Sequence, residues 1–139
     1  MRTITSPPRA AFLFRLDLRS GVPMYRQVID QVRSGIATGS LAAGDQLPTV
    51  RQLAVDLAIN PNTVVRAYRE LELGGLLETH QGTGTFISRK RVAKDSGERE
   101  RHLAQIVRDF VARAGAAGFT VDDLLEQLRL FGSEPTRRR

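Results

Sequence analysis

Apolar residues recur every three or four positions over the middle of the chain, which is the period of an amphipathic helix. Two such stripes follow one another, the first made of Val50, Leu53, Ala54 and Leu57 and the second of Val64, Ala67, Tyr68 and Leu71. Pro61 lacks the amide that a helix interior needs and moves Asn60 out of the helical region, so the first helix ends before it. Asn60 and Pro61 suit the N-cap and first turn of the second helix. The pattern predicts two short helices joined by a tight turn.

The ends of these helices carry recognisable signals. Thr49 precedes Gln52 by three residues, the spacing of a capping box in which each residue bonds the backbone of the other. Gly74 and Gly75 end the second helix, because glycine adopts the left-handed C-terminal conformation without a steric penalty. A hairpin follows, with strands over 76–79 and 85–88 and a turn at Gln81-Gly82-Thr83-Gly84. This order of elements predicts a winged helix-turn-helix over residues 12–88, whose second helix presents its N-terminal residues to the major groove of DNA.

The segments before these helices have weaker patterns. Residues 1–11 have no period and are interpreted as a flexible arm, either a bland tail or a DNA contact. From Phe12 to Leu18 apolar positions alternate, which predicts a short half-buried strand beside the hairpin or a partner subunit. Pro23 suits the first position of a helix running to about Thr38, and residues 41–45 form a connector. The apolar stripe of this helix, with Tyr25 interpreted as a core residue, is Tyr25, Val28, Ile29, Val32 and Ile36.

The C-terminal part of the chain predicts a helical hairpin after a linker. Residues 89–97 are charged and aperiodic, and their basic cluster at 89–91 either reaches phosphates or is solvated. A helix from 98 to about 114 is followed by a glycine-containing break, and Thr120 with Asp123 forms a second capping-box pattern. Residues 133–139 are interpreted as a basic tail without regular structure.

The helices within 98–132 have too little material to bury both of their apolar faces alone. Dimerisation explains the spare face, because a two-fold dimer buries the same patch twice. Packing against the chain's own winged domain is the alternative. The expected dimerisation residues are Leu103, Ile106, Val107, Phe110, Val111, Leu124, Leu125, Leu128 and Phe131. The whole is a mainly α fold with a small β-hairpin wing (α+β).

Composition narrows the classes of function. The formal charge of +6 and the pI of about 10.9 favour a polyanionic partner. The chain has no cysteine, and its only histidines, His80 and His102, are far apart in sequence, so no metal site and no cofactor are expected. No apolar run approaches the roughly 20 residues of a membrane span, and no signal-peptide core is present, so a cytoplasmic protein is expected. No set of nucleophile, base and orienting group stands out, so an enzyme is not expected.

The ordered motifs resemble the winged helix-turn-helix domain of GntR-type transcriptional regulators over residues 12–88. They are PMYRQV at 23–28, GDQLPTVRQLA at 44–54, NPNTV at 60–64, AYRELE at 67–72, GLL at 75–77 and GTGTF at 82–86. The NPNT opening of the second helix and the short C-terminal part are similar to the YtrA subfamily, in which two C-terminal helices dimerise. The resemblance implies a homodimeric repressor, commonly of an operon that encodes a transport system.

Carried over by position, the resemblance implies a DNA contact for Arg51, contacts near the groove for Asn62 and Thr63, and a wing tip at Gly82. The chain departs from the family at Pro61 and Val65, where arginine is frequent, so those two base contacts are missing. The expected DNA-binding residues are Thr49, Arg51, Asn60, Asn62, Thr63, Arg66, Arg69, His80, Gln81, Gly82 and Thr83.

Two hypotheses about function follow. The first is a sequence-specific DNA-binding regulator that acts as a homodimer on a palindromic double-stranded operator. A small-molecule effector at the helical hairpin, or in the cleft beside it, would change the spacing of the two recognition helices. The second is a protein-interaction or ligand-gated module whose winged helix does not read DNA.

Overall fold

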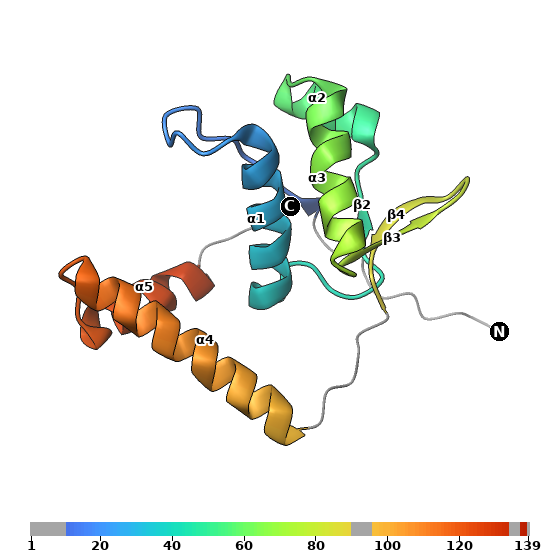
Figure 1. The fold of residues 1–139 in the computed structure, drawn as a ribbon. Coiled ribbons are helices and arrows are strands. Elements are labelled where there is room, and N and C mark those ends of the chain that lie inside the picture. Colours follow the sequence, from blue (N-terminus) through green and yellow to red (C-terminus); the bar gives the residue numbers. More distant parts are fainter. Residues whose placement is uncertain (1–10, 90–95, 134–136, 139) are drawn as a thin grey trace. The chain divides into compact units, whose positions relative to one another are not determined.

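The structure, a computed structural model, describes residues 11–89, 96–133 and 137–138 (Figure 1). The described residues fall into two compact units. The first holds 11–89 with 137–138, and the second holds 96–133. Each unit has its own packing. Residues 1–10 of the predicted N-terminal arm (1–11) and residues 90–95 of the predicted linker (89–97) lie outside the described residues.

Three helices and a small sheet form the first unit. Its helices are α1 (Met24–Thr38), α2 (Val50–Leu57) and α3 (Pro61–Leu73). The sheet contains β2 (Gln46–Leu47), β3 (Leu77–His80) and β4 (Gly84–Ile87) in the antiparallel order β2-β4-β3. The hairpin β3-β4 projects beyond the helices as a wing (Figure 1). The predicted class, mainly α with a small β wing, is confirmed.

The third strand of the sheet was not expected. Residues 46 and 47 fall just after the predicted connector, but they form β2, in which Gln46 pairs with Phe86 and Leu47 with Thr85. Backbone bonds extend the pairing beyond the strand, from Gly44 N–H to the Ile87 carbonyl and from Ile87 N–H to the Asp45 carbonyl, both at 2.8 Å. The segment that enters α2 is therefore joined to the base of the wing.

The core of the first unit lies between the three helices and the inner face of the sheet. The predicted helical stripes meet there: Val28, Ile29 and Val32 come from α1, Leu53 and Ala54 from α2, and Val64, Ala67, Tyr68 and Leu71 from α3. The sheet adds Leu47, Leu77 and Ile87. Because all three helices and the sheet share one core, the direction of α3 is set by every element of the unit.

The predicted strand from Phe12 to Leu18 is wrong for most of its length. Only β1 (Ala11–Phe12) is a strand, and its partner is β5 (Arg137–Arg138), at positions where the sequence predicted an irregular tail. Beyond it, the extended backbone is bonded by two glutamine side chains of α1. Gln31 accepts from Arg15 N–H at 2.8 Å and donates to its carbonyl at 2.6 Å, and Gln27 pairs with Asp17 in the same way. Side-chain amides thus take the place of a neighbouring strand.

Two helices form the second unit, namely α4 (Ser96–Ala116) and α5 (Val121–Ser133). Gly118, with a φ of +89°, provides the turn between them. The predicted capping box at the start of α5 is present in both directions. Thr120 N–H donates to the Asp123 carboxylate at 2.9 Å, and Asp123 N–H donates to the Thr120 hydroxyl at 3.2 Å.

Most of the apolar side chains of the second unit are exposed. Of the predicted dimerisation residues, Val111 and Leu124 are half-buried. The exposed ones are Leu103, Ile106, Val107, Phe110, Leu125, Leu128 and Phe131. In the parts of the chain that the structure describes, no helix combines the length and the apolar content that crossing a membrane requires.

Candidate nucleic-acid interface

The turn between α2 and α3 is built by local hydrogen bonds and one unusual residue. Asn60 caps α3 as predicted, its side chain accepting from Asn62 N–H at 2.8 Å. α2 ends at Leu57 because Ala58 adopts the left-handed conformation, with φ 54° and ψ 46°. In the sequence, Pro61 alone predicted the end of the first helix, and no glycine marks the turn.

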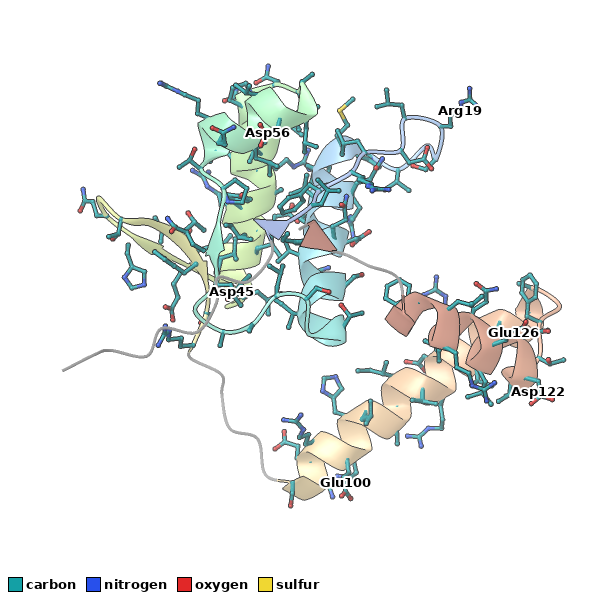
Figure 2. All side chains as sticks on the ribbon, turned by 180° about the vertical axis from the view of Figure 1, so that it is seen from behind. Arg19, Asp45, Asp56, Glu100, Asp122 and Glu126 are labelled. Carbon is teal, nitrogen blue, oxygen red and sulfur yellow. The ribbon has the colours of Figure 1, made fainter. Side chains whose placement is uncertain are left out.

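Only half of the predicted capping box of α2 forms. The Thr49 hydroxyl accepts from Gln52 N–H at 3.0 Å. The Gln52 side chain, however, donates at 2.7 Å to Asp56, one turn further along α2. Asp56 is labelled in Figure 2. The bond to Asp56 orients the Gln52 amide along α2. The reciprocal capping-box bond, from Thr49 N–H to the Gln52 side-chain oxygen, is therefore not formed.

A buried tyrosine connects α3 to the start of α2. The Tyr68 hydroxyl donates to the Pro48 carbonyl at 2.8 Å, while burial raises the pKa of the phenol well above its ordinary value. The phenol therefore stays protonated and remains a hydrogen-bond donor. Because Pro48 directly precedes the N-cap Thr49, this bond sets where α2 begins relative to α3.

The outer face of α3 carries the candidate DNA-reading groups. With 3.6 residues per turn, Asn62, Arg66 and Arg69 fall opposite the buried stripe, and all three are exposed. Thr63 is half-buried at the edge of this face, and its N–H donates to the Asn60 carbonyl at 3.0 Å. Amide and guanidinium groups can bond base edges and phosphates.

Arg66 is held by two neighbours inside the first unit. Its guanidinium carbon lies 3.7 Å from the centre of the Tyr25 ring on α1. Glu70, one turn further along α3, lies 3.9 Å from its Nε. Tyr25 is half-buried and packs against the core, as predicted, but it also carries this cation–π contact. The Arg66 side chain is still 61% exposed, so its outer edge remains accessible.

The wing tip is exposed, and hydrogen bonds fix its conformation. The turn closes when Thr83 donates its N–H to the His80 carbonyl at 3.0 Å. Gly82, with a φ of +82°, stands in open space. The Gln46 side chain donates to the Thr83 carbonyl at 3.1 Å, and a Cβ on Gly84 would come within 2.6 Å of that amide. The Gln46 side chain of β2 thus supports the tip, a role that was not predicted from the sequence.

A polar cluster lies on one face of the hairpin. Ser88 donates to Glu78 at 3.0 Å, and His80 Nε2 lies 3.4 Å from the same carboxylate. The Ser88 hydrogen bond is the main cause, with His80 as a smaller one, that lowers the pKa of Glu78. The His80 ring also meets Phe86 edge to face at 5.3 Å. These contacts orient His80 on the strand that leads to the wing tip.

A groove of about 600 Å³ runs between the outer side of α3 and the hairpin. The helices contribute both apolar and charged side chains to its lining, and the strands contribute threonines. The lining consists of Val50, Val65, Tyr68, Arg69, Glu72, Leu73, Thr79 and Thr85. Thr79 donates to Glu72 across it at 2.9 Å. Among the residues that the structure describes, no group of three or more histidine and acidic side chains could hold a metal ion.

The structure places all of the predicted DNA-binding residues in the first unit, and all but Thr63 are exposed. They lie at the start of α2, along α3 and at the wing tip. The support from Gln46 and the stacking of Tyr25 on Arg66 were not predicted. Neither has a local sequence signal, because the partners are 37 and 41 positions apart.

Comparisons with known proteins agree with this geometry. The model of the gntR family of bacterial regulatory proteins matches residues 24–87. The transcriptional repressor YtrA of Bacillus subtilis is 34% identical over 122 residues, which cover 88% of this chain and 94% of that protein. The regulator Rv1152 of Mycobacterium tuberculosis is 40% identical over 114 residues, covering 82% and 89%. The solved structure of YtrA from Sulfolobus acidocaldarius, 31% identical, aligns with a TM-score of 0.54 over 74% of this chain and 97% of that one.

Proposed function

Because the chain belongs to the GntR family and is a DNA-binding transcriptional regulator, we propose that it is a homodimeric repressor that binds a palindromic operator. The observation that carries the dimer is the exposure of seven apolar residues on α4 and α5 that share a helical stripe in each helix. A single chain that left so much apolar surface in water would be unusual. A two-fold dimer covers it and presents two copies of α3, as a palindrome requires.

The contacts with DNA divide into two kinds. Thr49, Arg51 and the wing-tip residues 80–83 face the backbone or the minor groove, which fixes the position of the protein on the duplex. Asn60, Asn62, Thr63, Arg66 and Arg69 serve the major groove, where base edges differ in their donors and acceptors. The positive formal charge of +6 adds affinity that does not depend on sequence.

Repression follows from occupancy of the operator, and the regulated operon encodes a transport system, as the YtrA resemblance implies. The protein works in the cytoplasm, where the chromosome is. An effector that binds the α4–α5 segment would release the operator by changing the separation of the two α3 helices, which is about 34 Å for successive half-sites. A metabolite that releases the operator while small-angle scattering shows an unchanged dimer would contradict this mechanism.

A gel-shift titration with the protein's own promoter region tests specific binding. The labelled fragment is titrated with the full chain in the presence of excess unlabelled competitor, either the same fragment or a scrambled one. We expect the native competitor to displace the labelled fragment at least about a thousandfold more effectively, the lower end of typical specificity ratios. Equal displacement by both competitors would reject specific reading and favour a module whose winged helix does not read DNA.

A further inference from the structure

Val65 is an apolar residue among the polar side chains near the start of α3. Val65 lies between Asn62 and Arg69 on the helix surface and is 39% exposed. A β-branched side chain at an exposed helical position costs helix stability relative to alanine, and only burial normally offsets this cost. The core of the first unit does not include Val65. Packing in that core therefore does not account for the valine.

Part of the Val65 side chain is accessible from outside the first unit. It lines the groove beside α3 together with Tyr68 and Arg69, on the side of the helix away from Arg66. Arg66 is drawn toward α1 by Tyr25, at 3.7 Å. The second turn of α3 thus presents one accessible apolar side chain in the part of the helix where a recognition helix meets base edges.

We propose that Val65 is a specificity-determining residue that contacts the C5-methyl group of a thymine in each half-site. The thymine methyl is the apolar group that standard bases expose in the major groove, so it is the partner that a valine can recognise there. Asn62 is three positions earlier, and side chains at this spacing have Cβ atoms about 5–6 Å apart. Its amide suits an adjacent adenine. The inference rests on the proposed function, and it adds the identity of a base.

The test removes the methyl groups of Val65 and the C5-methyl group of thymine, first separately and then together. The full wild-type chain first selects its binding site from randomised duplexes. Each thymine of the selected site is then replaced by deoxyuracil, which lacks only the C5-methyl. Affinities are measured for the wild type and for Val65→Ala and Val22→Ala. Val22 is a matched control because it is a valine of nearly equal exposure, 40%, outside the recognition helix.

We expect one thymine per half-site whose replacement by deoxyuracil weakens wild-type binding about three- to fivefold, as loss of one buried methyl contact should. The Val22→Ala protein should show the same loss. The Val65→Ala protein should bind the thymine and deoxyuracil sites equally, which is the coupling that defines a direct contact. Circular dichroism should show unchanged helix content, since alanine suits an exposed helical position.

If no thymine distinguishes the wild type from Val65→Ala, the inference is overturned while specific binding stands. If the selection enriches no sequence, the proposed function fails and the inference fails with it. A wild-type loss at a thymine that persists unchanged in Val65→Ala would assign that methyl to another residue, which also overturns the inference.

Discussion

Ala58 occupies a backbone conformation that costs an alanine about 1–2 kcal/mol. The conformation persists because its N–H bonds the carbonyls of Ala54 and Val55 and because α3 must start within three residues. A strained residue at the turn of a helix-turn-helix fixes the angle at which the second helix leaves the first. The strain is thus stored where α2 and α3 are connected.

Replacing Ala58 with glycine should stabilise the protein. Glycine removes the strain but raises the entropy of the unfolded chain, so we expect the free energy of unfolding to rise by about 0.5–1 kcal/mol. Urea denaturation followed by circular dichroism measures it. The control, Ala37→Gly, changes an exposed alanine in the last turn of α1 and should lower the free energy by up to about 1 kcal/mol. Destabilisation by both changes would contradict the assignment.

Arg51 should contribute to DNA binding without regard to sequence. It is exposed on α2. A guanidinium that contacts the DNA backbone neutralises phosphate charge. We expect Arg51→Ala to weaken binding to operator and scrambled duplexes alike and to reduce the slope of log affinity against log salt by about 0.9. The control Arg33→Ala removes the same charge from α1. An operator affinity that is unchanged at every salt concentration would show that Arg51 does not touch the backbone.

At the scale of elements, α1 organises the chain that precedes it. Its two glutamines bond the backbone of Arg15 and Asp17 as a strand would. Each amide supplies both a donor and an acceptor, so one residue satisfies two main-chain groups. The N-terminal segment is therefore attached to the first unit through side chains.

Gln31→Ala should release that segment at one point. We expect the Arg15 amide to exchange with solvent faster, and the free energy of unfolding to fall by about 1 kcal/mol, because the net value of a hydrogen bond is of that order. The Asp17 amide, bonded by Gln27, should keep its protection. Gln52→Ala, which removes only a surface pair within α2, should change stability by about 0.2–0.5 kcal/mol. Unchanged exchange at Arg15 would refute the role of Gln31.

The start of α5 should respond to acid. Thr120 lowers the pKa of Asp123, first through its backbone N–H and then through its hydroxyl. The folded pKa lies below the unfolded one, so the ionised carboxylate stabilises the helix start above the ordinary Asp pKa of about 4, and the contribution disappears as pH falls through the lowered pKa.

Nuclear magnetic resonance can follow this titration at the Thr120 amide. The Thr120 signal should move with the Asp123 carboxylate below pH about 4, and Asp123→Asn should abolish that movement. Asp122, labelled in Figure 2, is an acidic residue in the same turn of α5. Asp122→Asn should leave the movement of the Thr120 signal unchanged. A Thr120 titration that survives in Asp123→Asn would show that another group is responsible.

At the scale of the whole molecule, the proposed dimer would connect the second unit to operator binding. Phe110 lies on the exposed apolar stripe of α4. A charge buried at this position would destabilise the interface, so Phe110→Asp should sediment as a single chain at concentrations where the wild type sediments as two. Operator affinity should fall by about a hundredfold, because the second half-site no longer binds intramolecularly.

Ala112→Asp is the matched control, since it adds the same charge to the opposite face of α4, where the residue is exposed. It should remain dimeric and bind the operator normally. Dissociation of both variants would indicate a general effect of charge on α4, and a wild type that sediments as one chain would reject the dimer.

Sequence by itself determined the helices, the hairpin of the wing and the family. The helix starts at Asn60 and Thr120 were predicted correctly because a cap and its partners lie within three residues of each other. The apolar stripes that form the core were also readable, since one face of a helix repeats every three to four positions.

Only the tertiary structure decided which distant groups meet. Glutamine side chains of α1 bond the segment that was predicted as a strand, and β2 pairs with β4 of the wing. The Arg66 guanidinium lies over the Tyr25 ring. The Gln52 side chain donates a hydrogen bond to Asp56, and Ala58 adopts the left-handed conformation in a turn that no glycine marks. Each of these depends on how whole elements pack, and a pattern of period two or 3.6 carries no information about partners far along the chain.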